Sequence, residues 1–222
     1  MDAGIPNERG LASAREFFAR ARARLNLTVP AALIDITAEA VRGDLDLDPA
    51  LWECAGASAT KPAAVLIPVI ERAEPMVLLT QRTAELPNHP GQIAFPGGKI
   101  DDGDVNPLAA ALRETKEEIG LDARFIDPIG YLDLFLTFSG FRILPTLARV
   151  APDYALALNA AEVTEVFEVP LAFLMAPANH QRLKRDWKGI ERQYYAMPYQ
   201  QRYIWGVTVG ILRNLYERIY GG

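Results

Sequence analysis

Residues 106–120 read Asn-Pro-Leu-Ala-Ala-Ala-Leu-Arg-Glu-Thr-Lys-Glu-Glu-Ile-Gly, and this stretch carries the clearest local signals in the chain. Asn106 is a good helix N-cap, because its side-chain oxygen can accept a backbone N–H of the first turn. Pro107 suits the first helical position, where a missing N–H costs nothing. Gly120 stands where a left-handed residue commonly closes a helix. The pattern predicts a helix that begins after Asn106 and ends before Gly120.

Three carboxylates share one face of this helix. Glu114, Glu117 and Glu118 are spaced i, i+3 and i+4, so their side chains project together. Like charges at this spacing repel one another unless a cation relieves them. Oxygen ligands without sulfur or imidazole favour Mg²⁺ or Mn²⁺. The bare pattern is also typical of a solvated helix face, so the surrounding residues have to decide.

The segment before the helix adds an acidic, glycine-containing cradle. The Gly97-Gly98 pair offers backbone that can approach a ligand or metal closely. Further carboxylates stand at the helix entrance, at Asp101, Asp102 and Asp104. Arg113 can orient the glutamates through charge-assisted hydrogen bonds. Loop, helix and turn together favour a metal site over a plain charged surface.

Outward from this cradle, apolar runs predict strands and a closing helix. Two buried strands are expected at 63–70 and 76–80, followed by a loop from Glu85 to Gly91. Later strands are expected at 129–138 and 141–150, joined by a Ser139-Gly140 turn, and near 166–169 and 194–197. A final helix is expected from an apolar stripe at Ile204, Val207, Ile211, Leu215 and Ile219. Strands and helices interleave without regular alternation, which indicates an α+β fold with a mixed sheet covered by helices.

Residues 1–60 predict a helical extension ahead of a main domain at 61–222. An amphipathic helix is indicated by one apolar stripe, made of Leu11, Ala14, Phe18, Ala21 and Leu25. Its arginines, Arg15, Arg20, Arg22 and Arg24, would also suit an organelle transit peptide, but the stripe favours a docked helix with its arginines in water. The acidic stretch that follows, with Asp44, Asp46 and Asp48, is expected to be mostly helical or irregular.

Composition excludes several classes of protein. The net charge of −5 argues against a general nucleic-acid binder, which usually carries a basic surplus. No apolar run approaches the ~20 residues needed to span a bilayer. The single cysteine, Cys54, is expected to pack beside Trp52 and fits a reducing compartment, so we expect a cytoplasmic protein without a membrane partner. The only histidines, His89 and His180, are too few for a His-rich zinc site.

The glycine, carboxylates and helix together resemble the signature of the Nudix hydrolases. That signature runs Gly, five residues, Glu, seven residues, then Arg-Glu-apolar-x-Glu-Glu-x-Gly-apolar, and residues 113–121 match its second half. There are three departures: Asp104 replaces Glu, eight residues separate it from Arg113, and Thr115 takes an apolar position. The first two are shared by the coenzyme A pyrophosphatase branch of the family. The resemblance implies a Nudix-type α/β/α sandwich with a mixed sheet.

That branch has a second signature just upstream, approximately Leu-Leu-Thr-x-Arg-Ser, a spacer containing Arg, and Gly-x-x-x-Phe-Pro-Gly-Gly. This chain has Leu-Leu-Thr-Gln-Arg-Thr at 78–83 and Gly-Gln-Ile-Ala-Phe-Pro-Gly-Gly at 91–98. Thr83 stands for Ser, and Pro87 occupies the spacer position where Arg is usual. The resemblance covers about residues 62–212, since Ile204-Trp205-Gly206 is similar to the start of the family's closing helix. Two adjoining motifs in register are far more specific than either alone.

The resemblance implies a role for each site residue. One or more Mg²⁺ or Mn²⁺ ions would be held by Glu114, Glu117 and Glu118 with the Gly98 carbonyl, bridging the diphosphate and activating a water. Arg113 would orient these carboxylates. The general base would be Glu114 or a glutamate of a later loop, Glu162 or Glu165. The substrate would meet Gly97, Gly98 and Arg82. The basic cluster of Lys184, Arg185 and Lys188 is expected to be a solvated face, and His89 a turn residue without a role.

Several alternatives stay open. The small-molecule substrate is expected to be coenzyme A or a derivative, cut into 3′,5′-ADP and 4′-phosphopantetheine. The altered Pro87 keeps ADP-ribose, a dinucleotide or a nucleoside triphosphate in consideration. A non-catalytic Nudix domain that only binds a nucleotide ranks lower, because such domains usually lose the helix glutamates. A homodimer is neither required nor excluded.

Overall fold

The structure is a computed structural model that describes residues 14–35, 37, 42–44, 46, 47, 61–187 and 189–221. The predictions made for Leu11, Asp48, Trp52, Cys54 and Lys188 lie outside these residues. No helix in the described ranges combines the length and apolar character that a bilayer crossing needs.

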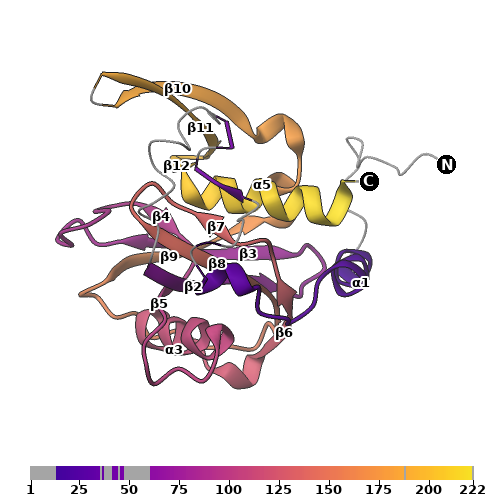
Figure 1. The fold of residues 1–222 in the computed structure, drawn as a ribbon. Coiled ribbons are helices and arrows are strands. Elements are labelled where there is room, and N and C mark those ends of the chain that lie inside the picture. Colours follow the sequence, from indigo (N-terminus) through magenta and orange to yellow (C-terminus); the bar gives the residue numbers. More distant parts are fainter. Residues whose placement is uncertain are drawn as a thin grey trace.

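A mixed sheet forms the centre of the molecule (Figure 1). Its longest strands, β2 (Lys61–Ile70) and β8 (Phe141–Val150), run parallel over their full length. The other strands of this sheet, within the described residues, are β1 (Arg42–Gly43), β3 (Met76–Arg82), β4 (Ile93–Ala94), β5 (Gly97–Lys99), β6 (Ile126–Tyr131), β7 (Phe135–Leu136) and β9 (Val163–Pro170). The strands expected at 63–70 and 76–80 are thereby confirmed as β2 and β3.

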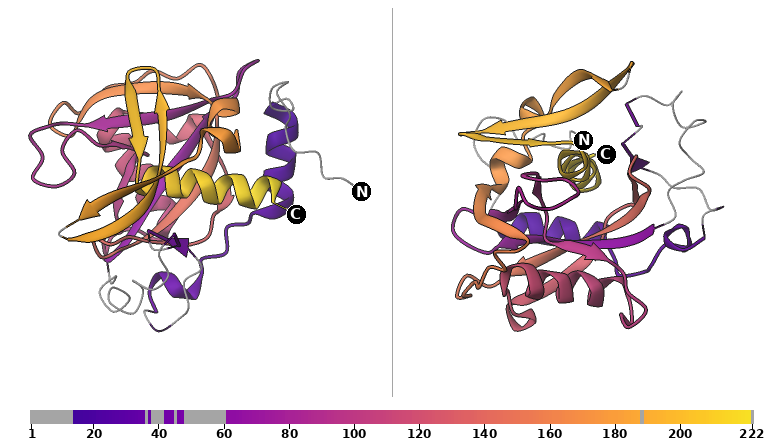
Figure 2. Two further views of the ribbon diagram at one scale, coloured as in Figure 1. Left: turned by 90° about the horizontal axis from the view of Figure 1, so that it is seen from above. Right: turned by 90° about the vertical axis from the view of Figure 1, so that its left-hand side faces the viewer.

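Helices cover both faces of this sheet, as an α/β/α sandwich requires (Figure 1). Helix α3 (Pro107–Ile119) lies on one face. Helix α5 (Val207–Tyr220) lies on the other, with α1 (Ala14–Arg24) beside its C-terminal end (Figure 2). The shorter helical segments are η1 (Ala31–Leu33), η3 (Ala123–Phe125), α4 (Leu171–Leu174) and η4 (Pro177–Asn179). A second sheet, β10 (Gln181–Trp187), β11 (Ile190–Tyr199) and β12 (Arg202–Trp205), extends over α5.

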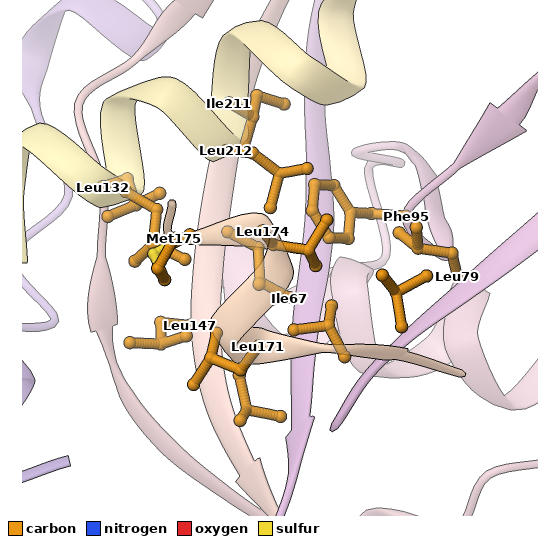
Figure 3. Packing of buried hydrophobic residues seen from close by; sticks show 14 of the residues in the cluster. Ile67, Leu79, Phe95, Leu132, Leu147, Leu171, Leu174, Met175, Ile211 and Leu212 are labelled. Carbon is orange, nitrogen blue, oxygen red and sulfur yellow. The ribbon is translucent and has the colours of Figure 1, made fainter. Parts of the chain in front are cut away.

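Strand β2 shows why the sheet is covered twice. Ala64 and Leu66 are fully buried against Ala110 and Ala111 of α3. The alternate residues Ile67 and Val69 are buried in the larger core beneath α5, part of which Figure 3 shows. Because successive side chains of a strand point to opposite faces, a continuous apolar run has to be buried on both.

The N-terminal helix is docked, as its apolar stripe predicts. Phe17, Phe18 and Ala21 are buried in the core beneath α5. Its arginines stay at the surface: Arg22 pairs with Asp127 at 2.6 Å, and Arg24 donates to the carbonyls of Arg218 and Gly221. The acidic stretch after it was expected to be helical or irregular, yet β1 pairs in parallel with β7.

Two sequence predictions are wrong in detail. The strand expected at 129–138 is interrupted at 132–134, because β6 and β7 pair with different parts of β8. Leu132, Asp133 and Leu134 continue the apolar–polar alternation of a strand, with both leucines buried, so the residue pattern shows no break there. The last helix begins at Val207, whereas Ile204 belongs to β12. Gly206, with φ of 65°, makes the turn between them.

Candidate metal centre

Helix α3 begins and ends where its sequence predicts. The Asn106 Oδ1 atom accepts the Ala109 N–H at 2.8 Å, and Gly120 has a left-handed φ of 71°. Thr115 and Ile119 are fully buried, so the opposite side of the helix faces away from the sheet. The Thr115 hydroxyl donates to the Ala111 carbonyl at 2.6 Å, which satisfies the buried polar group that stands at the signature's apolar position.

Arg113 donates hydrogen bonds to three carboxylates at once. Its Nε and Nη2 atoms donate to the two oxygens of Asp104, at 3.0 and 2.9 Å. Its Nη1 atom donates to Glu114 at 3.0 Å and to Glu117 at 3.1 Å. The hydrogen bonds from Arg113 hold the pKa of the Asp104 carboxyl below its ordinary value. The structure therefore places Arg113 against two of the glutamates that it is expected to orient.

Glu118 is the buried member of the glutamate group. Only 3% of its surface is exposed. Its carboxylate accepts the Gly97 N–H at 3.1 Å and lies 3.7 Å from the Arg82 guanidinium. Burial is the main cause that raises its pKa to about 7; the nearby Glu114 and Glu162 charges also raise it, whereas the Gly97 hydrogen bond and the Arg82 charge lower it. A carboxylate in this setting is poorly neutralised by the protein alone.

Glu114 lies directly against the glycine turn. A Cβ atom built on Gly98 would stand 2.5 Å from the Glu114 Cδ atom, so this carboxylate would have to move if residue 98 carried a side chain. Burial is the main cause that raises the pKa of Glu114, with the Glu117 and Glu162 charges adding to it. Gly97 has a φ of 149° and would clash with the Ala64 carbonyl if it carried a Cβ. Strand β5 is thus at backbone contact with β2, and the Glu114 side chain of α3 lies against its Gly98.

The structure separates the two loop glutamates. Glu162 lies close enough to Glu114 and Glu118 for its charge to act on both. Glu165 forms an ion pair with Arg202 of β12. The Arg202 guanidinium also lies 4.2 Å from the Phe167 ring centroid, and Phe167 belongs to the core beneath α5. Glu165 is therefore turned to the other face of the sheet, away from α3.

The remaining polar candidates lie elsewhere. His180 is buried, with its Nε2 atom 2.7 Å from the Leu174 carbonyl oxygen, and His89 is an exposed turn residue with φ of 55°. Lys184 pairs with Glu191 on the β10–β11 hairpin. A cavity of about 160 Å³ lies between β1 and α5, lined in part by Glu217, which binds two arginines. Its lining residues among those described include neither Asp104, Glu162 nor any glutamate of α3.

Comparison with known proteins agrees with this geometry. A family model described as the NUDIX domain matches residues 60–187. The chain belongs to the Nudix family. A protein of Cronobacter sakazakii named uncharacterized Nudix hydrolase NudL is 40% identical over 155 residues, which is 70% of this chain and 81% of that protein. The protein of the same name from Escherichia coli K12 is 38% identical over the same shares.

Among solved structures, a Caenorhabditis elegans Ap4A hydrolase in a binary complex is similar at 24% identity and a TM-score of 0.41, over 49% of this chain and 80% of that one.

Nudix hydrolases generally use divalent ions such as Mg²⁺ or Mn²⁺, and the residues of this chain suit such an ion. Glu114 is partly buried and Glu118 is buried, and burial raises the pKa of both; Glu162 adds a third nearby charge. These are hard oxygen donors. Among the described residues, no three Asp, Glu, His or Cys side chains already converge as a metal site. In this arrangement Arg113 binds Glu114 and Glu117. The donor chemistry fits the ion, and Arg113 is the group that would share its carboxylates with it.

Proposed function

We propose that this Nudix hydrolase cleaves the diphosphate linkage of coenzyme A or its derivatives, giving 3′,5′-ADP and 4′-phosphopantetheine. Family membership supports hydrolysis of a diphosphate linkage in general. The narrower substrate rests on the residues that resemble the coenzyme A branch at 78–83 and 91–98.

One observation carries the proposal: the two motifs meet at Glu118. Arg82, from the upstream signature, lies 3.7 Å from one Glu118 oxygen, and the Gly97 amide donates to the other at 3.1 Å. The segment that resembles the coenzyme A branch is therefore part of the same site as the carboxylate helix. A residue change in that segment would act on the site directly.

Side chains of this protein would activate the attacking water, orient the glutamates and contact the substrate. Glu162 would remove a proton from the water that attacks phosphorus, while the bridging P–O bond breaks and the leaving phosphate keeps its electron pair. Arg113 would fix the directions of Glu114 and Glu117. Arg82 would place a positive charge beside the substrate's phosphates. A divalent cation, when bound by Glu114, Glu117, Glu118 and the Gly98 carbonyl, supplies neutralisation of charge on the phosphoryl oxygens.

A second candidate keeps the reaction and changes the substrate. Pro87 stands where the coenzyme A branch usually has an arginine, so one cationic contact of that branch is missing. This departure from the branch keeps ADP-ribose, a dinucleotide or a nucleoside triphosphate as candidate substrates. A binding-only domain is disfavoured, because Glu114, Glu117 and Glu118 are all present and grouped around Arg113 and Gly97.

The substrate is decided by parallel assays. The protein is incubated with coenzyme A, ADP-ribose and NADH separately, with Mg²⁺ or Mn²⁺, and the products are identified by chromatography and mass. We expect 3′,5′-ADP and 4′-phosphopantetheine as the main products and the highest kcat/KM for coenzyme A. A higher kcat/KM for ADP-ribose would overturn the substrate assignment while leaving the reaction class intact.

The metal assignment is tested separately with Glu117→Gln. This variant loses a carboxylate that is half-exposed and bound to Arg113, so the fold should persist while metal-dependent turnover falls. Glu191→Gln, which also loses an exposed ion-paired carboxylate but on the β10–β11 hairpin, serves as the matched control. Full metal-dependent turnover by Glu117→Gln would contradict the assignment.

A further inference from the structure

The loop that carries Glu162 is attached to the end of the carboxylate helix. The Asn159 N–H donates to the Glu118 carbonyl at 2.9 Å, and the Ala157 N–H donates to the Ile119 carbonyl at 2.9 Å. A Cβ on Gly120 would stand 2.7 Å from the Ala157 backbone nitrogen. Helix end and loop are therefore at backbone contact, and a shift of one moves the other.

The side chain of Asn159 reaches across this loop to the Glu162 carboxylate. Its Nδ2 atom donates to Glu162 Oε1 at 3.1 Å, and its Oδ1 atom accepts the Ala161 N–H at 3.2 Å. A carboxylate only accepts and a backbone N–H only donates, so this is the one orientation of the amide that satisfies both partners. Asn159 thus makes two distinct contacts: one shapes the turn and the other holds Glu162.

Glu162 is also fixed from the opposite side. Its carbonyl accepts the Thr83 N–H at 2.9 Å, directly after Arg82 of β3. Its backbone N–H donates to the Asn159 carbonyl at 2.9 Å. The backbone of Glu162 is therefore held between the upstream signature and the carboxylate helix. These backbone bonds do not fix its side chain, which has three rotatable bonds and is partly exposed.

We propose that Asn159 is a positioning residue, whose amide holds the Glu162 carboxylate in the direction needed to accept a proton from the attacking water. The inference rests on the proposed function, since it assigns a task to the base of that reaction. Without the amide, the Glu162 side chain is free to rotate toward solvent although its backbone stays in place. Small misplacements of a reacting group reduce a rate by up to about 100-fold.

Two variants separate the positioning contact from the turn contact. Asn159→Ala removes both. Asn159→Asp keeps an oxygen for the Ala161 N–H but removes the donor to Glu162 and sets a second carboxylate against it. We expect kcat to fall roughly 10- to 100-fold in both variants, with KM changed by less than about 3-fold. Wild-type kcat in Asn159→Asp would show that only the turn matters and would overturn the inference.

The matched control is Asn179→Ala. The Asn179 side chain likewise donates one hydrogen bond, to the Phe173 carbonyl at 2.8 Å, in the loop after α4. Its variant should keep the wild-type kcat. Binding of Mn²⁺, measured by calorimetry without substrate, should be unchanged in Asn159→Ala, because the carboxylates of α3 are untouched. Loss of Mn²⁺ binding in that variant would mean that the site has collapsed, and would contradict a positioning role.

A double-mutant cycle with Glu162→Gln gives the sharpest result. If Asn159 acts through Glu162, then Asn159→Ala should lower kcat by less than about 2-fold once Glu162 is replaced. If the fold loss in kcat of the double variant equals the product of the two single losses, the residues act independently and the inference is overturned. Failure of the proposed function appears already in the wild type, as absent turnover of coenzyme A, whereas failure of this inference appears only in the variants. If the wild type prefers ADP-ribose, the same cycle is measured with that substrate.

Discussion

The backbone amide of Gly97 donates a hydrogen bond to the Glu118 carboxylate at 3.1 Å, from strand β5 to a helix residue 21 positions further along the chain. Glu118 is thereby held in a buried position between β5, Arg82 and the Glu162 loop. The protein supplies this buried negative charge with one amide and one arginine at 3.7 Å, which suits the metal-binding role that we propose for Glu118.

The stability of the metal-free protein should fall as the pH rises from about 4.5 to 7. The fold raises the pKa of Glu118 from 4.5 to about 7, so folding favours its neutral form. Its contribution is complete below pH 4.5 and is lost as the pH passes 7, by on the order of 3 kcal/mol. Urea unfolding in EDTA at pH 5 to 8 measures this, and the pH dependence should be smaller in Glu118→Gln. A wild type and variant with parallel pH dependence would contradict the assignment.

Metal addition should reverse that loss. A divalent cation neutralises the carboxylates in the folded state only, so Mg²⁺ or Mn²⁺ should raise the Tm of the wild type at pH 8 in a concentration-dependent way. The Tm of Glu118→Gln should respond much less. Ca²⁺ at equal ionic strength controls for screening by divalent salt, and an equal Tm rise in both proteins would indicate screening instead of binding.

Gly98→Ala should lower turnover at least about 10-fold, because the new Cβ would stand 2.5 Å from the Glu114 Cδ and displace that carboxylate. Gly103→Ala is the matched control, since no atom lies within 4 Å of its added Cβ. Turnover and Tm are measured for both variants. Equal turnover in the two would show that the position of Glu114 against the turn is unimportant.

Arg113→Lys should lose both stability and turnover although it keeps the charge. Arg113 donates two hydrogen bonds to Asp104, at 2.9 and 3.0 Å. A lysine has a single nitrogen, so it cannot make this bidentate contact and also reach Glu114. We expect the free energy of unfolding to fall by about 1–3 kcal/mol, measured in urea. Lys116→Arg, on the same helix and paired with Asp122 at the surface, controls for a change of basic residue and should be neutral.

Arg82→Met should raise KM for coenzyme A by roughly 10-fold and lower kcat by less than that. The reason is that a charged contact to phosphate contributes about 1.5–3 kcal/mol. Arg22→Met, which removes a surface ion pair with Asp127, should leave both constants unchanged. An unchanged KM with reduced kcat in Arg82→Met would assign Arg82 to the support of Glu118 in place of substrate contact.

Helix α3 could be predicted in full because its signals are local. Asn106, Pro107 and Gly120 act within one turn of each end, and the shared face of the three glutamates follows from helix periodicity alone. The docking of α1 followed likewise from an apolar stripe. The failed details are the interruption at 132–134 and the place of Ile204. Leu132-Asp133-Leu134 continues the alternation of a strand, and Ile204 lies on the apolar stripe of the helix that follows it. Hydrophobicity there does not distinguish a strand from its neighbour.

The sequence by itself determined the family, the carboxylate helix, its glycine turn and the upstream motif with Arg82. Only the tertiary structure decided how the acidic residues differ. It buries Glu118 and leaves Glu117 at the surface, it brings Glu162 to the α3 face while Glu165 pairs with Arg202, and it sets Asn159 between the end of α3 and Glu162. Each of these outcomes depends on contacts between segments far apart in the chain, whose register no local pattern encodes.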